Sequence, residues 1–113
     1  MDKKLAKKLE SVMNAVPVCE GLIYCELDGE VIIGQTITEM DHSAIAKKMV
    51  DILESDLSAA NKGDIKDASI ELEEGALVGV LGDDNFVIGI LGDDGLSSKG
   101  LLRKQLQNLM NSE

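Results

Sequence analysis

The chain has 113 residues, of which 44% are hydrophobic and 28% are charged. This composition is typical of one globular domain spanning residues 1–113, which can bury a core without a metal or a disulfide. The formal net charge is −10, and the sequence contains one Tyr, one Phe and no Trp. Such an acidic chain repels phosphate backbones and has few rings to stack on bases, which argues against a nucleic-acid partner.

The start of the chain lacks the apolar core of a signal peptide, and no apolar run approaches the roughly 18 residues of a membrane span. Cys19 and Cys25 would lie about 20 Å apart on a strand, which is too far for a disulfide. We interpret them as core thiols in a reducing compartment, and predict a cytoplasmic protein with no integral membrane segment. The lysines at positions 3, 4, 7 and 8 are interpreted as a solvated helix face rather than a membrane-docking patch.

The first elements predicted are a helix and a hairpin. Residues 3–16 carry apolar side chains at helical spacing, and Pro17 ends that helix. Residues 19–27 form a strand that is apolar on both faces, with Cys19 and Ile23 on one face and Leu22 on the other. Asp28-Gly29 predicts a two-residue type I′ turn into a second strand over residues 30–37.

A middle helix follows, capped by Asp41 and ended by Gly63 after about residue 61. Its apolar positions span roughly 180° of the helix surface, whereas packing on a sheet needs only about 100°. We therefore expect this helix to carry more apolar surface than its own sheet can cover. Asp56 falls inside the apolar arc, either as a buried acid at a seam or exposed where the helix overhangs the sheet.

Three strands and a last helix complete the chain. Residues 66–73 alternate between apolar and polar, which predicts an edge strand with one face in water. Tight turns then lead into strands over residues 76–82 and 86–92. Ser97 or Ser98 caps a final helix whose apolar stripe contains Leu102, Leu106, Leu109 and Met110.

The tetrapeptide Leu-Gly-Asp-Asp occurs twice, at residues 81–84 and 91–94. The two acidic pairs would lie about 20 Å apart at opposite ends of a strand, so they cannot share a cation. The sequence contains neither a phosphate-binding GxxxxGK[ST] loop nor GxGxxG, and the one histidine, His42, is expected to be solvated in the first turn of a helix. These features predict no catalytic residues, no cofactor and no metal site, so millimolar calcium or magnesium should not raise the melting temperature.

The chain resembles the Roadblock family, which includes dynein light chains. The resemblance rests on the element order and on the segments GLIYCELDGEVIIGQ, ASIELEEGALVGVLGDDNFVIGIL and GLLRKQLQNLM. It implies an α+β fold of order α-β-β-α-β-β-β-α. In that three-layer sandwich, the middle helix lies on one face of a five-stranded antiparallel sheet and the terminal helices lie on the other.

The resemblance also implies a dimer formed by pairing the third strand and packing the middle helices across a two-fold axis. The expected interface comprises Ile45, Met49, Ile52, Leu53, Asp56, Asp67, Ser69, Glu71 and Glu73. Like charges on Asp67, Glu71 and Glu73 would oppose one another in a homodimer, which leaves room for a heterodimer with a more basic roadblock relative.

The function implied is a non-enzymatic scaffold or regulator of a Ras-like small GTPase. The alternatives are a structural light-chain-type subunit of a motor or other large complex, and a longin- or profilin-like adaptor. The GTPase is expected on a polar strip beside the apolar arc of the middle helix, formed by Lys47, Lys48, Asp51, Glu54 and Ser55. Arg103, the one arginine, lies on a rigid helix and is not expected to act as an arginine finger.

Overall fold

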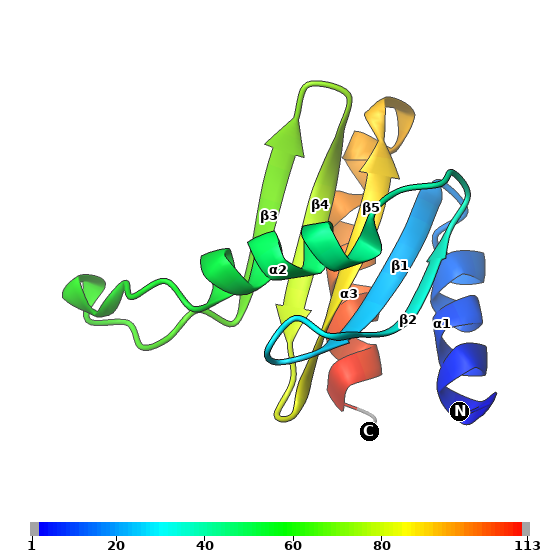
Figure 1. Cartoon of the computed structure of the whole chain (residues 1–113). Helices are drawn as coiled ribbons and strands as arrows, with labels where there is room; N and C mark the ends of the chain where they lie inside the picture. The colour runs from blue at the N-terminus through cyan, green and yellow to red at the C-terminus, as the bar shows by residue number, and fades with distance from the viewer. Residues whose placement is uncertain (1–2, 112–113) are drawn as a thin grey trace.

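A computed structural model describes residues 3–111. Five antiparallel strands form one sheet in the order β2-β1-β5-β4-β3, so β2 and β3 are its edges (Figure 1). The helices and strands, with two short 3₁₀ turns η1 and η2, are α1 (Lys3–Ala15), β1 (Cys19–Glu26), β2 (Val31–Thr36), α2 (His42–Leu53), η1 (Ser58–Ala60), β3 (Asp67–Leu72), β4 (Gly75–Leu81), β5 (Asn85–Gly92), η2 (Asp93–Ser98) and α3 (Lys99–Asn111).

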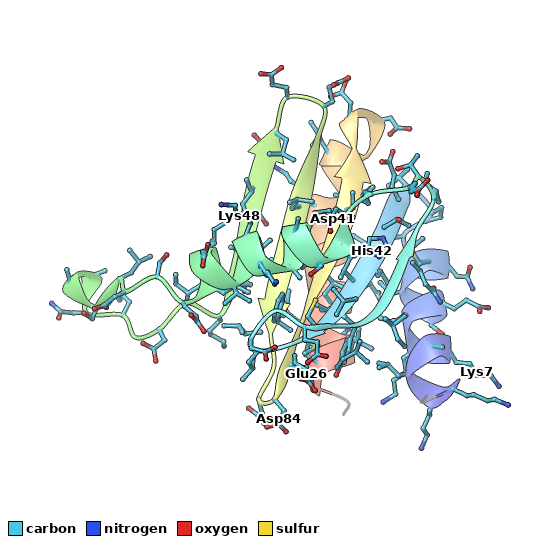
Figure 2. All side chains as sticks on the ribbon, in the orientation of Figure 1. Lys7, Glu26, Asp41, His42, Lys48 and Asp84 are labelled. Atoms are coloured by element: carbon cyan, nitrogen blue, oxygen red, sulfur yellow. The ribbon has the colours of Figure 1, made fainter. Side chains whose placement is uncertain are left out.

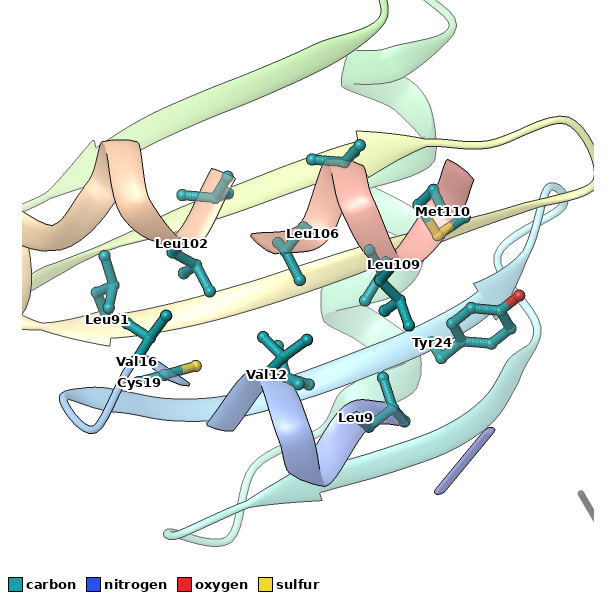
Figure 3. Packing of buried hydrophobic residues seen from close by; sticks show 14 of the residues in the cluster. Leu9, Val12, Val16, Cys19, Tyr24, Leu91, Leu102, Leu106, Leu109 and Met110 are labelled. Carbon is teal, nitrogen blue, oxygen red and sulfur yellow. The ribbon is translucent and has the colours of Figure 1, made fainter. Parts of the chain in front are cut away.

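Helices cover both faces of this sheet, as the resemblance to the Roadblock family implies. α2 crosses one face, and α1 and α3 pack side by side on the other (Figure 1). The larger core lies between the sheet and the terminal helices, where Leu9, Leu102 and Leu106 are fully buried (Figure 3). The smaller core lies under α2 and contains Phe86 and Ile88 of the central strand. No helix among residues 3–111 is long and apolar enough to cross a membrane.

The turn between β1 and β2 differs from the predicted type I′ turn. Gly29 has φ of +96°, whereas Asp28 does not adopt a positive φ. The Gly29 N–H donates to the Glu26 carbonyl and the Glu26 N–H donates to the Glu30 carbonyl, each at 2.9 Å. The loop therefore has three residues, with a type I turn followed by a left-handed glycine. The Asp28 carboxylate accepts from the Glu30 N–H at 2.9 Å, which stabilises this longer turn.

Cys19 lies on the face opposite to the one predicted. The register between β1 and β5 shifts between Cys19 and Gly21, so one extra residue interrupts the alternation of side chains. Cys19 consequently joins Leu22 in the core under the terminal helices, while Cys25 joins Ile23 in the core under α2. Both cysteines are free and buried on opposite faces of the sheet.

We expect neither thiol to react with Ellman's reagent at pH 8 in the native protein. Burial raises the pKa of Cys25 to about 12, from an ordinary value of 9.0. Because the folded pKa is raised, the neutral thiol's contribution to stability is complete below pH 9 and is lost as the pH rises towards 12. Denaturant should expose two thiols per chain. Rapid labelling of Cys25 without denaturant would contradict this burial.

α2 ends at Leu53, about two turns earlier than predicted. The Ser55 hydroxyl donates to the Asp51 carbonyl at 3.0 Å, and the Asp56 carboxylate accepts from the Ser58 N–H at 2.9 Å. These local bonds compete with the helical ladder. Beyond Leu53 the helix would also pass the edge strand β3, where no sheet lies beneath it (Figure 1). Since short helices depend on tertiary packing, the segment 54–66, which we term the arm, leaves the helix.

Candidate functional site

The surface predicted to bind partners is built by α2 and β3. Asp41 caps α2, its Oδ1 accepting from the Ala44 N–H at 3.0 Å. The helix crosses the sheet at the height where Gly79 leaves room for it. A Cβ added at Gly79 would lie 2.7 Å from the sulfur of Met49. The absence of a side chain on β4 therefore sets how closely α2 approaches the sheet.

The apolar arc of α2 is divided between the core and the surface. Met49 and Leu53 are 1% and 6% exposed because they face the chain's own sheet. Ile45 is half-buried, and Ile52 remains 36% exposed on the flank of the helix. Of the predicted interface residues on the helix, Ile52 therefore offers the most surface, whereas Met49 and Leu53 are already covered within one chain.

Asp56 does not lie on the helix, because α2 ends before it. Its side chain is exposed within the arm. The hydrogen bond that its carboxylate accepts from the Ser58 N–H lowers the pKa of the carboxyl group. Of the two positions considered for this residue, the exposed one is observed.

The predicted GTPase-binding residues form a continuous exposed strip along α2 and into the arm. Lys47, Lys48, Asp51, Glu54 and Ser55 are all exposed. Figure 2 shows Lys48 extending away from the helix. The Cγ of Lys47 lies 3.3 Å from the position that a Cβ on Gly29 would occupy, so the β1–β2 turn packs beside the strip.

That turn carries an acidic group that the sequence reading missed. Carboxylate oxygens of Glu26, Asp28 and Glu30 lie within 4.8 Å of one another, and all three side chains are exposed. The alternation of acids in the segment ELDGE is the signal that could have revealed it. The strip on α2 therefore borders a concentrated negative charge. The two Asp-Asp pairs lie at opposite ends of β5, as predicted, and Figure 2 shows Asp84 at the tip of the β4–β5 turn.

The sequence predicts that the polar face of β3 lies in water. In the structure, side chains of α3 instead pair with two carboxylates on this face. Arg103 Nε donates to Asp67 Oδ1 at 3.1 Å, and Gln107 Nε2 donates to Asp67 Oδ2 at 3.3 Å. Lys99 forms an ion pair with Glu71 and lowers the pKa of that carboxyl group. Ser69 and Glu73 remain exposed. Two of the predicted interface carboxylates are thus paired within the chain.

His42 is half-buried rather than solvated. Its Nε2 lies 2.9 Å from the Thr36 hydroxyl, and its ring lies so close to Gly34 that a Cβ there would be 2.2 Å from Nδ1. The imidazole therefore ties the start of α2 to the edge strand β2. This contact gives the histidine a structural role at the junction of α2 and β2.

Comparison with known proteins identifies the fold. No protein-family model matches the chain, and no curated protein matches its sequence. A Roadblock/LC7 domain from Streptomyces avermitilis is 16% identical, with a TM-score of 0.77 over 94% of this chain and 91% of that one. Myxococcus xanthus MglB is 11% identical, with a TM-score of 0.79 over 96% of this chain and 90% of that one.

The fold is that of Roadblock/LC7 domains. Profilin II from Acanthamoeba castellanii is also similar, at 9% identity and a TM-score of 0.68 over 94% of this chain and 96% of that one. The chain therefore also shares its fold with profilin, the adaptor class that the sequence leaves open as an alternative. The higher TM-scores of the two bacterial proteins favour the roadblock comparison.

Proposed function

We propose that this chain is a non-enzymatic dimeric binding module that scaffolds or regulates a Ras-like small GTPase. The observation that carries the proposal is the exposed polar strip on α2, which starts beside the β1–β2 turn and continues into the arm, in a roadblock fold. The strip offers both signs of charge along one helix face, which suits a partner recognised through polar contacts.

The dimer would form through β3 and the flank of α2. Among the described residues β3 pairs only with β4, and Leu72 of β3 and Ile52 of α2 are 53% and 36% exposed. The charge on Asp67 and Glu71 is offset by Arg103 and Lys99 of the same chain. That compensation weakens the objection that like charges would meet across a homodimer, so we expect twice the monomer mass by light scattering at micromolar concentration.

The GTPase-binding strip can be tested by reversing its charges. The triple variant Lys47→Glu, Lys48→Glu, Asp51→Lys should lose at least tenfold in affinity for a Ras-like GTPase captured from native lysate, because charge reversal turns attraction into repulsion. Binding is measured by titration with the GTPase loaded with GDP or with a GTP analogue. Lys104→Glu, on α3 across the sheet, is the matched control.

Comparing the two nucleotide states of the GTPase distinguishes a regulatory role from a structural one. Affinity that depends on the bound nucleotide supports a GTPase regulator or effector scaffold. Equal affinity for both nucleotide states would instead indicate a structural subunit of a larger complex. Unchanged affinity of the triple variant would contradict the location of the strip.

Arg103→Ala should leave any stimulated GTP hydrolysis within about threefold, whereas loss of an arginine finger costs 10³ or more. Arg103 is held by Asp67 and lies on the face of the sheet opposite α2. A single-turnover hydrolysis assay with saturating variant measures the effect. Abolished stimulation with intact binding would show that α3 is a catalytic element and that a scaffold mechanism is wrong.

A further inference from the structure

An apolar groove with an acidic rim lies where β3 turns into β4. Its volume is about 360 Å³, Leu72, Leu77 and Ile90 form its apolar floor, and Glu20, Glu73 and Glu74 stand around it. None of the described residues lining it is basic. The groove is therefore suited to an apolar side chain accompanied by a positive charge.

The groove opens on the same face of the sheet as α2. Leu77 and Ile90 belong to the core cluster beneath that helix. β3 and β4 extend past α2 towards their shared turn, so α2 leaves this end of the sheet uncovered (Figure 1). Leu72 is 53% exposed as a consequence.

The arm offers an exposed apolar side chain and a lysine. It extends from the end of α2 past the edge strand β3, away from its own sheet (Figure 1). Leu57 is 58% exposed, and Lys62 is exposed five residues further along. The arm also carries the acids Glu54, Asp56 and Asp64, so Lys62 acts as a single positive group near Leu57 and not as part of a positively charged segment. Leu57 and Lys62 are therefore both exposed on the arm, away from the chain's own sheet.

A two-fold axis at β3 would bring the arm and the groove together. The arm joins β3 at its Asp67 end, whereas the groove lies at its Leu72 end. In an antiparallel β3–β3 pair, the Asp67 end of one copy lies beside the Leu72 end of the other. An axis perpendicular to the sheet keeps both features on the same face. Each arm is thus directed over the groove of the second copy.

We propose that the arms are exchanged in a homodimer of this chain: Leu57 of each protomer enters its partner's apolar groove, and Lys62 faces the acidic rim. This inference rests on the proposed dimer, to which it adds a contact between the arm of one protomer and the groove of the other. It commits to a second copy as the occupant because antiparallel pairing at the β3 edge directs the exposed Leu57 of one arm over the apolar floor of the other copy's groove, with Lys62 beside its glutamates.

Cysteine cross-linking tests the contact directly. Leu57→Cys protein mixed with Leu72→Cys protein should give a disulfide-linked dimer on mild oxidation, and neither protein alone should do so to the same extent. The native thiols are buried and do not compete. Leu101→Cys, exposed on α3 across the sheet, replaces Leu72→Cys as the matched control. Cross-linking no greater than this control would overturn the arm contact.

A charge exchange provides a second measurement. Lys62→Glu should raise the dimer dissociation constant at least tenfold, and Lys62→Glu combined with Glu73→Lys and Glu74→Lys should recover most of that loss. Asp83→Lys with Asp84→Lys, at the opposite end of the sheet, is the matched control for the added lysines and should recover none of it.

Light scattering separates this inference from the proposed function. A stable dimer whose dissociation constant is unchanged by both Leu57→Ser and Lys62→Glu would overturn the exchanged arm and leave the dimeric module intact. A native protein that stays monomeric at about ten micromolar would overturn both the arm exchange and the homodimer. Loss of GTPase binding with the arm contact intact would overturn the function alone.

Discussion

Met49→Glu is expected to prevent folding rather than to yield a folded monomer. Met49 is 1% exposed and packs over Gly79 of the chain's own sheet. A carboxylate buried there has no positive partner, and its desolvation costs several kcal/mol out of the roughly 5–15 kcal/mol that stabilise a domain. Far-UV circular dichroism and a thermal melt of the purified variant measure this loss.

Ile52→Glu is the matched control because it places the same charge on the same helix. Ile52 is 36% exposed, so the variant should fold with a melting temperature within a few degrees of the native protein. Its light-scattering mass should instead fall towards that of one chain. A cooperatively folded Met49→Glu protein would show that α2 does not rest on its own sheet as described.

Gly75→Ala should destabilise the protein by about 3 kcal/mol and lower its melting temperature by more than about 10 °C. A Cβ at Gly75 would lie 2.2 Å from the carbonyl oxygen of Leu91, and backbone cannot rotate out of the way as a side chain can. The start of β4 would have to separate from β5. Differential scanning calorimetry measures the shift.

Gly100→Ala, the same substitution at another position, is expected to raise the stability of the protein and not to lower it. A Cβ at Gly100 meets nothing within 4 Å, and the residue lies within α3. Alanine should therefore raise stability by about 0.5–1 kcal/mol, because it restricts the unfolded chain more and favours the helix. Equal effects at the two positions would contradict the close approach of β4 to β5.

The pairing of β3 with α3 affects how the proposed dimer should be understood. Asp67 and Glu71 carry the negative charge that made a homodimer unfavourable in the sequence, yet each already has a cationic partner. These pairs are partly exposed and each contributes little to stability. Their consequence is electrostatic: they reduce the repulsion that two β3 edges would otherwise experience.

The sequence by itself determined the order of the helices and strands. It also determined which face of each terminal helix is buried. Leu5 and Leu9 in the first helix, and Leu102 and Leu106 in the last, are each four residues apart, and such periodicity is a local property of the chain. The alternation in residues 67–72 likewise marks an edge strand before any neighbour is known. The resemblance to roadblock proteins extended these local patterns to the layered fold.

Only the tertiary structure decided where α2 ends and which groups meet across the sheet. The helical pattern continues past Leu53, but a helix there would have no sheet to cover its apolar side. A single extra residue between Cys19 and Gly21 moved Cys19 to the other core. The partners of Asp67 and Glu71 lie 36 and 28 residues away along the chain, and no local pattern encodes a contact that folding alone creates.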